Sequence, residues 1–308
     1  MMNKTILAIA VGTLATSGMA MAEDLKADAY IGAELGGNFL VGEESAQGEG
    51  TFAADNMIKV GAEISQKVAH DVNVFVGTEV RFGMEGVDSD FHEGKYDGDS
   101  TEIHRFSVGA DTVAGRSEFG ILEGMADTTD GFADLSMEHG LNAAFDGAIN
   151  GDNTLEHTFT NELLTATASY DFSTEAYHVG GTVKAGQIVT LGGAYVDSGE
   201  DVDQQAYTLG AVADLGQFAV AAKYIAEEGD DTFENTGYGV SGSYSLNEKV
   251  AFAASYNSVD YDDSSMEDDD FFTVGASYAV SKNVELVTDY KFASEVDDQV
   301  FVRANINF

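Results

Sequence analysis

The side chains that most often carry nucleophilic or metal-dependent catalysis form no recognisable site in this sequence. There is no cysteine, which excludes zinc–thiolate centres and thiol nucleophiles. The histidines are His70, His92, His104, His139, His157 and His178. None lies in an HExxH sequence or beside a serine and an aspartate in a nucleophile arrangement. The sequence therefore predicts a protein that is not an enzyme and that has no cofactor or metal site.

Charge is the chemistry that this sequence carries in quantity. It has 54 acidic residues against 14 basic ones, a formal net charge of −40 at pH 7. A field of that sign repels phosphate backbones, which argues against nucleic acid as a partner. It suits a surface that gathers cations or that functions in high salt. Four of the few basic residues lie on the polar side of alternating segments: Lys26, Lys59, Arg81 and Arg105.

The first 22 residues are typical of a secretory signal peptide. Lys4 supplies a positive charge, ten residues from Thr5 to Leu14 form an apolar run, and residues 20–22 have a small-x-small pattern. We expect cleavage after Ala22, which divides the chain into a signal peptide of residues 1–22 and one domain of residues 23–308. A short buried helix is the alternative interpretation of the apolar run. No other long apolar stretch follows, so the sequence predicts no transmembrane helix.

Beyond residue 22, apolar and polar residues alternate with period two. Within 72–82, one face is Val, Val, Val, Thr, Val, Phe and the other is Asn, Phe, Gly, Glu, Arg. Short connections, such as 67–71, 216–217, 247–249 and 281–283, alternate with long acidic ones. This order predicts an up-and-down antiparallel meander whose two ends face different compartments.

The composition of the two faces indicates which one meets lipid. One carries Val, Leu, Ile, Ala and Phe, with tyrosines near the strand ends, and the other carries Gly, Ser, Thr, Asn and charged residues. This pattern favours an all-β transmembrane barrel with lipid outside and water inside. Closure also removes unpaired strand edges, which lipid does not tolerate. A soluble sandwich or lipocalin-like barrel is the alternative, but such small aliphatic side chains would not fill its interior.

The number of strands follows from the alternation of the connections. The pattern gives fifteen segments: about 25–40, 55–66, 72–83, 102–114, 117–125, 158–170, 175–185, 187–197, 205–215, 218–228, 236–246, 250–261, 271–280, 284–294 and 299–308. Bacterial single-chain barrels have an even number of strands. We therefore predict sixteen strands, with fourteen as the alternative. The further strand is expected within roughly 138–157, near 140–149, unless one strand has been divided.

The signal peptide, the meander and the C-terminal Phe308 together resemble the Gram-negative general porins. The stretch 116–125 is similar to the F-G-x-L-x-x-G-R sequence that precedes the constriction loop of that family. The matching residues are Phe119, Gly120, Leu122 and Gly124. Met125 stands where the family usually has arginine, so one basic charge of the family's pore wall has no counterpart here. The resemblance covers residues 23–308 in layout and few positions in identity.

This resemblance implies that the longest connection, about 126–157, folds into the barrel and narrows the pore. Its acidic residues are Asp127, Asp130, Asp134, Glu138, Asp146 and Asp152. They would face the four basic residues of the early strands, which we call the basic wall: Lys26, Lys59, Arg81 and Arg105. Opposed charges would create a transverse field across a narrow aqueous gap. The alternative is that both sets are simply solvated, since any inward position favours polar residues.

The last strand carries an apolar row of Val302, Ala304, Ile306 and Phe308. In the family, such a strand is read by the outer-membrane assembly machinery and closes the barrel against the first strand. The resemblance further implies a homotrimer in the outer membrane, surrounded by lipid and lipopolysaccharide. The long acidic connections would contact lipopolysaccharide through divalent cations, or they are solvated loops of an organism that lives in salt.

We therefore expect a water-filled channel for passive diffusion of small hydrophilic solutes and ions, with the net acidity favouring cations. A substrate-selective, oligosaccharide-type channel is one alternative. It would need a run of aromatic residues along the lumen, where only Tyr30, Phe75 and Phe301 are evident. The other alternative is a structural or adhesive surface barrel whose acidic loops carry the function.

Overall fold

The computed structural model describes residues 25–41, 52–54, 56–83, 101–122, 132–141, 153–199, 204–229, 234–261, 268–293 and 298–308. Its strands are β1 (Leu25–Val41), β2 (Phe52–Ala54), β3 (Met57–Ala69), β4 (Val72–Gly83), β5 (Thr101–Thr112), β6 (Gly115–Ile121), β7 (Thr154–Thr160), β8 (Leu164–Asp171), β9 (Tyr177–Ala185), β10 (Val189–Asp197), β11 (Gln205–Asp214), β12 (Phe218–Glu228), β13 (Glu234–Asn247), β14 (Val250–Tyr261), β15 (Asp269–Ser281), β16 (Val284–Ala293) and β17 (Asp298–Asn307). Over these ranges, no helix is long and apolar enough to cross a membrane. The expected signal peptide, residues 1–22, lies outside the described residues.

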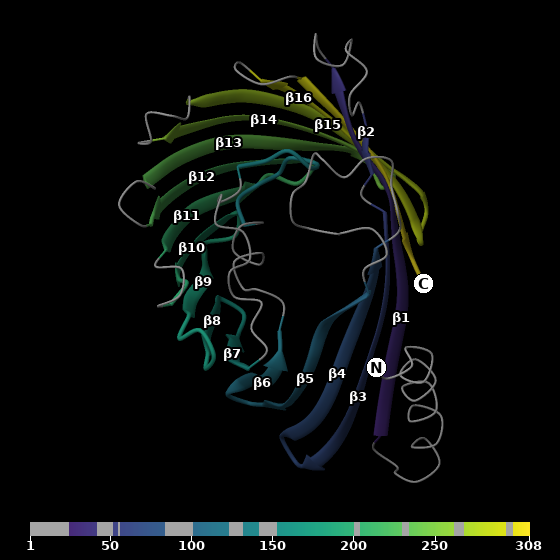
Figure 1. The fold of residues 1–308 in the computed structure, drawn as a ribbon, viewed down its shortest axis with the longest axis vertical. Helices are drawn as coiled ribbons and strands as arrows, with labels where there is room; N and C mark the ends of the chain where they lie inside the picture. Colours follow the sequence, from purple (N-terminus) through teal and green to yellow (C-terminus); the bar gives the residue numbers. More distant parts are fainter. Residues whose placement is uncertain are drawn as a thin grey trace.

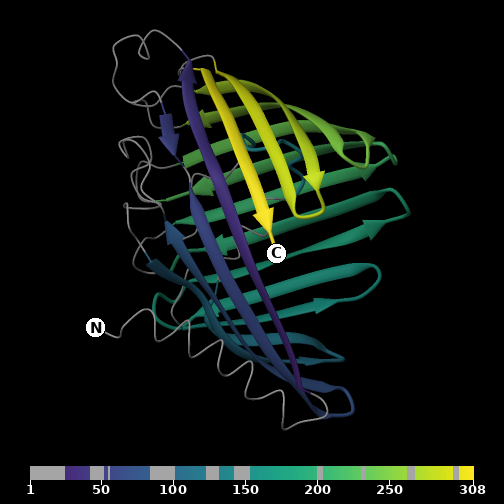
Figure 2. The same cartoon turned by 90° about the vertical axis from the view of Figure 1, so that its right-hand side faces the viewer.

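β1 closes the sheet into a barrel because it pairs on both sides. Residues 25–34 pair with β3, and residues 32–41 pair with β17. Reciprocal backbone bonds between Ile31 and Phe308 end the seam, at 2.8 Å and 3.1 Å. Figures 1 and 2 show β1 and β17 side by side. β2 is a three-residue strand beside β1. The wall is thus a closed antiparallel barrel of sixteen strands.

The predicted count of sixteen is confirmed, but the missing strand was placed wrongly. Segment 158–170, predicted as one strand, is divided between β7 and β8. Asn161 makes the turn between them, since its side-chain oxygen accepts the backbone N–H groups of Leu163 at 2.8 Å and Leu164 at 2.9 Å. β7 begins at Thr154, inside the expected long loop. Gly140 and Leu141 are not in a strand, and residues 142–149 lie outside the described part.

The alternation of residues separates an apolar outer face from a polar inner one. Val179, Leu209 and Val240 are 51%, 60% and 57% exposed on the outer face. Ser107 and Thr273, by contrast, are buried on the inner face. The barrel therefore carries its largest apolar surface outside, as a protein solvated by lipid must.

Tyrosines form a girdle around only part of the outer face. The outward tyrosines are Tyr170, Tyr177, Tyr195, Tyr207, Tyr224, Tyr238, Tyr244, Tyr256, Tyr278 and Tyr290, on β8–β16. Neighbouring rings touch, as in the pair Tyr195–Tyr207 with centroids 4.8 Å apart. In the described residues, β17, β1 and β3–β7 carry no outward tyrosine. The barrel circumference is thus divided into a part with outward tyrosines and a part whose outward aromatic residues are phenylalanines, such as Phe106 and Phe119.

The register at the seam predicts a specific cross-link. Gly32 lies opposite Asn307, next to the reciprocally bonded pair of Ile31 and Phe308, so it belongs to a pair with closely spaced side chains. The double variant Gly32→Cys/Asn307→Cys should form a disulfide under mild oxidation, because directly opposed cysteines satisfy disulfide geometry. A mobility shift on heated, non-reducing gels that reductant reverses would measure it. The control Gly32→Cys/Ile306→Cys places its cysteines on opposite faces, and equal cross-linking there would show that the register is wrong.

Candidate functional site

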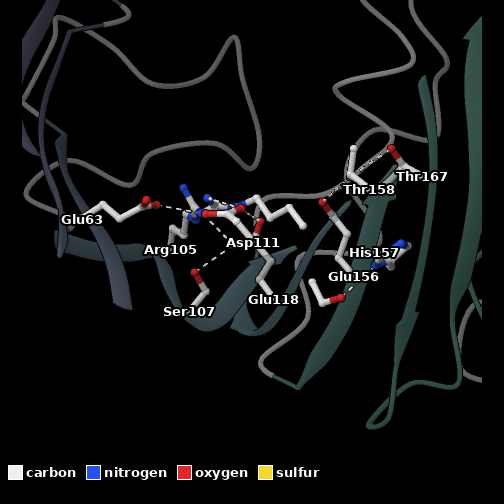
Figure 3. Close-up of polar contacts among 11 residues, drawn as sticks. Glu63, Arg105, Ser107, Asp111, Glu118, Glu156, His157, Thr158 and Thr167 are labelled. Carbon is white, nitrogen blue, oxygen red and sulfur yellow. Dashed lines mark hydrogen bonds and ion pairs between the residues drawn. The ribbon is translucent and has the colours of Figure 1, made fainter. Parts of the chain in front are cut away.

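The inner face of β5 and β6 holds a cluster of directly paired charges (Figure 3). Arg105 Nη2 on β5 lies 2.5 Å from Glu118 Oε2 on β6, and Ser107 Oγ donates to the same oxygen at 2.9 Å. Arg116 contacts three carboxylates, Glu63 at 2.7 Å, Glu118 at 3.3 Å and Asp111 at 3.4 Å. Glu118 therefore bridges two guanidinium groups.

The antiparallel register brings these charges together. Lys59 on β3 lies opposite Arg81 on β4, and Glu79 on β4 lies opposite Arg105 on β5. Beyond Glu79 the β4–β5 register shifts, so that Val80 lies opposite Ile103. Such a bulge adds one residue to a strand without changing the face of the residues beside it. Inward residues of four neighbouring strands therefore meet in one patch.

Three of the four residues of the predicted basic wall each lie beside a carboxylate. Lys59 Nζ is 2.8 Å from Glu34 Oε1, and Arg81 Nε is 2.7 Å from Glu79 Oε1. Arg105 pairs with Glu118 as described above. Lys26 lies at the exposed start of β1, opposite Ser65. Whether the four residues line the narrowest part of the lumen stays a prediction.

The carboxylate partners are members of this charged cluster that the sequence reasoning missed. They are Glu34, Glu63, Glu79, Asp111 and Glu118. A signal was present, since each shares the inward parity of its strand with a basic residue or lies opposite one. Glu79 and Arg81, for example, are two residues apart and point the same way.

The polar inner wall continues onto β7 and β8. Thr158 Oγ1 donates to Glu156 Oε1 at 3.3 Å and lies 3.1 Å from Thr167 Oγ1 (Figure 3). His157 points to the other face, where its Nδ1 is 2.8 Å from Ser117 Oγ. Within the described residues, no group of three His, Cys, Asp or Glu side chains could hold a metal ion.

Residues 132–141, which we call the inner segment, lie inside the barrel against β10–β17 (Figure 1). The Leu135 N–H donates to Ser241 Oγ on β13 at 3.0 Å. Lys223 Nζ on β12 donates to the Leu141 carbonyl at 2.6 Å. These contacts join residues more than 80 positions apart, which no local sequence pattern reports.

Asp289 on β16 is the strongest anchor of the inner segment. Its Oδ2 accepts the backbone N–H groups of Glu138 at 3.0 Å and His139 at 2.9 Å. The Asp289 side chain is fully buried. Charge-assisted bonds of this kind are about twice as strong as neutral ones, so Asp289 fixes the segment against the wall. The His139 ring also packs edge-on against Phe301 of β17, with centroids 6.2 Å apart.

The predicted acidic residues of the loop differ in their partners: one pairs with the barrel wall, one bonds within its own segment, and the others lie outside the described residues. Glu138 Oε2 lies 3.2 Å from Arg303 Nη2 on β17, and Arg303 Nη1 lies 3.6 Å from Glu34 on β1. Asp134 turns back on its own segment and accepts the Ser136 N–H at 2.8 Å. Asp127, Asp130, Asp146 and Asp152 lie outside the described residues. The ion pair of Glu138 with Arg303 therefore joins the inner segment to the last strand.

The apolar row of the last strand faces outward. Val302 is 45% exposed and Phe308 is 74% exposed. Ala304 and Ile306 lie between them, opposite Leu35 and Ala33 of β1. The row is therefore part of the outer surface at the seam.

Comparisons with known proteins agree with this architecture. A family model described as Gram-negative porin matches residues 7–298. Porin-like protein L of Photobacterium profundum is 23% identical, over 94% of this chain and 92% of its own. The trimer form of OmpT from Vibrio cholerae superposes with a TM-score of 0.72 at 13% identity, covering 93% of this chain and 100% of OmpT. Salmonella typhi OmpF in complex with daunomycin gives 0.71 at 14% identity, covering 92% and 98%.

Proposed function

Because this chain belongs to the Gram-negative porin family and forms an outer-membrane channel for diffusion, we propose that the channel prefers cations among the small hydrophilic solutes and ions that it passes. It spans the outer membrane with many strands and is not an enzyme, in keeping with a family of passive channels. The observation that carries the cation preference is the pairing of the inward basic residues with carboxylates on their own wall.

That pairing removes most of the positive field of the basic wall. Lys59, Arg81 and Arg105 each have a carboxylate oxygen within 2.5–2.8 Å. Further carboxylates, such as Glu63 and Asp111, converge on Arg116. The remaining field comes from a chain with a formal charge of −40. Such a field raises the local concentration of cations and is screened by salt.

We further propose that the basic wall and the acidic residues of the loop border the narrowest part of the lumen. The described loop acids, Asp134 and Glu138, belong to the inner segment, whose contacts keep it inside the barrel. Asp127, Asp130 and Asp146 would complete the acidic set. Polar solutes would pass between this segment and the charged face of β3–β6, which lies across the lumen from it.

The oligosaccharide-type alternative is disfavoured by the state of the inward aromatic rings. Phe75 is 3% exposed and lies under the Arg116 guanidinium at 3.6 Å. Phe301 is fully buried, with Arg303 4.9 Å above its ring. These two rings are thereby unavailable for stacking on sugars, and of the three inward aromatic residues only Tyr30, 43% exposed, remains accessible, which is a single ring and not a run. A conductance measurement distinguishes the channel from the adhesive-barrel alternative, because an adhesive barrel need not conduct ions.

Neutralising two residues of the basic wall tests the channel proposal. Arg81→Gln/Arg105→Gln leaves Glu79 and Glu118 with less counter-charge, so the preference for K⁺ over Cl⁻ should rise roughly two- to three-fold at low salt. Reversal potentials of planar bilayers under a KCl gradient measure it. The control is Lys282→Gln, an exposed turn lysine.

An unchanged selectivity would count against these arginines lining the constriction. Absence of conductance for the unaltered protein in any salt would contradict every channel proposal.

We also propose a homotrimer whose interface is the outer face without tyrosines, on β17, β1 and β3–β7. Outward tyrosines mark surfaces that meet the lipid–water interface, so their absence from these strands favours contact with protein, to which outward phenylalanines such as Phe106 and Phe119 would contribute. One structural neighbour, OmpT of Vibrio cholerae, is in a trimer form.

A pair of tryptophan substitutions tests the location of this interface. Ala62→Trp on β3 should dissociate the trimer by inserting bulk between subunits, whereas Ala222→Trp on the girdled β12 should leave it intact. Unheated gels and native mass spectrometry report the assembly state. Dissociation by the β12 variant alone would place the interface elsewhere.

Export, assembly and lipid contacts form a fourth proposal. Residues 1–22 act as the signal peptide, and the row Val302, Ala304, Ile306 and Phe308 is read by the assembly machinery. Outward carboxylates follow the tyrosine girdle at the loop end: Asp197, Glu228, Glu234, Asp260, Asp270 and Asp298. Divalent cations would connect these carboxylates to lipopolysaccharide phosphates.

Mass spectrometry of the protein purified from outer membranes tests these steps. The intact mass should correspond to residues 23–308, and lipopolysaccharide should co-purify and be lost after EDTA treatment. Phe308→Ala should lower the amount of barrel in the membrane, because the terminal aromatic ring is absent. A chain that retains residues 1–22, lipid retention that EDTA does not change, or a normal yield of Phe308→Ala would contradict the respective step.

A further inference from the structure

Inward glycines of the barrel wall lie directly beneath apolar side chains of the inner segment. The five glycines are Gly192 on β10, Gly210 on β11, Gly237 and Gly239 on β13, and Gly275 on β15. The register aligns several of them laterally: Gly192 lies opposite Gly210, Gly210 opposite Lys223, and Lys223 opposite Gly239. They therefore form a band across the wall and not a scattered set.

The inner segment occupies the space that side chains at these positions would fill. A Cβ on Gly192 would stand 2.6 Å from Phe132 Cδ1, and one on Gly210 would stand 2.5 Å from Ala133 Cβ. On β15, a Cβ on Gly275 would stand 2.9 Å from Met137 Cβ.

Leu141 makes the corresponding contacts on β13. Its Cδ1 lies 2.9 Å from the Cβ position of Gly237, and its own Cβ lies 3.2 Å from that of Gly239. Four side chains of the segment are thus seated where the wall lacks its own.

Backbone conformation does not explain these glycines. None of the five has a positive φ, in contrast to turn glycines such as Gly186 and Gly216. Glycine inside a strand is unfavourable unless another backbone or side chain must approach closely. The inward Gly77, on the other side of the lumen, shows the difference: a Cβ there would meet its nearest atoms at an ordinary 3.5–3.7 Å.

We propose that these five glycines form a recess that seats the inner segment and so determines the aperture of the channel. The proposal rests on the channel function argued above and assigns an aperture-determining role to the wall opposite the charged cluster. Because the five glycines carry no side chain, Phe132, Met137 and Leu141 can pack directly against the backbone of the wall. Any side chain added at the recess displaces the segment toward β3–β6 and narrows the path of the solute.

Substitutions in the recess should lower the single-channel conductance in proportion to their size. Gly192→Ala should cause a smaller loss than Gly192→Val, and Gly275→Ala should act in the same direction. The matched control is Gly77→Ala, an inward glycine with free space for a methyl group, which should keep the conductance. An unchanged or increased conductance of the Gly192 and Gly275 variants would overturn the proposal.

A compensating substitution separates displacement of the segment from simple filling of the lumen. Removing the ring in Gly192→Val/Phe132→Ala should restore conductance toward that of the unaltered channel, because the new side chain then occupies the place of the ring. Failure of this rescue would overturn the proposal.

A variant on the loop side covers the case in which a strand substitution prevents folding. Phe132→Trp enlarges the seated ring and leaves every strand intact, so it should also lower conductance, and no loss would contradict the recess. Each variant is first shown to be assembled by its mobility on unheated gels. If the unaltered protein does not conduct, the proposed channel function is wrong. If it conducts and the variants have the same conductance, only the proposal of the glycine recess is wrong.

Discussion

Lipid offers the backbone no hydrogen-bond partner, and the rest of this structure depends on that constraint. A sheet in lipid must have no open edge, and β1 meets this condition by pairing with β3 along its first half and with β17 along its second. Closure then separates two solvents. Because the side-chain period is two, a slip of one residue would exchange the faces, so the register at the seam also determines which residues reach the lumen.

The lumen must then hold most of the charge that the strands carry, apart from the outward carboxylates at the loop end. Its basic residues are partly shielded from water, and an unpaired guanidinium there would be costly. The structure answers with carboxylates two residues away on the same strand or diagonally on the neighbouring strand, as for Arg81 with Glu79 and Arg105 with Glu118. Compensation on one wall has a functional consequence, since the wall then opposes the acidic field of the chain much less than four free cations would.

Much of the fold was predictable, because contact with lipid on one face and water on the other makes period two visible in nearly every strand. The exception is β7, which has only seven residues. Its turn to β8 contains neither glycine nor proline, so Asn161 was the one residue in the sequence that indicated a turn there. The inward position of the basic residues could be predicted from the period-two alternation alone. Their carboxylate partners had the same parity but were overlooked, because opposed charges were expected from the loop. The contacts of Asp289 and Arg303 join segments about 150 residues apart, and only the closed barrel brings them together.

The seat of the inner segment shows how closely the loop and the wall depend on each other. Five strand positions give up a side chain, which weakens a strand on its own. The segment supplies the missing contacts and is held at Glu138 and His139 by Asp289 and Arg303. Arg303 also lies beside Glu34 across the seam. One side chain therefore contacts both the closing strand and the loop, so the environment that positions the loop is complete only when β1 and β17 have met.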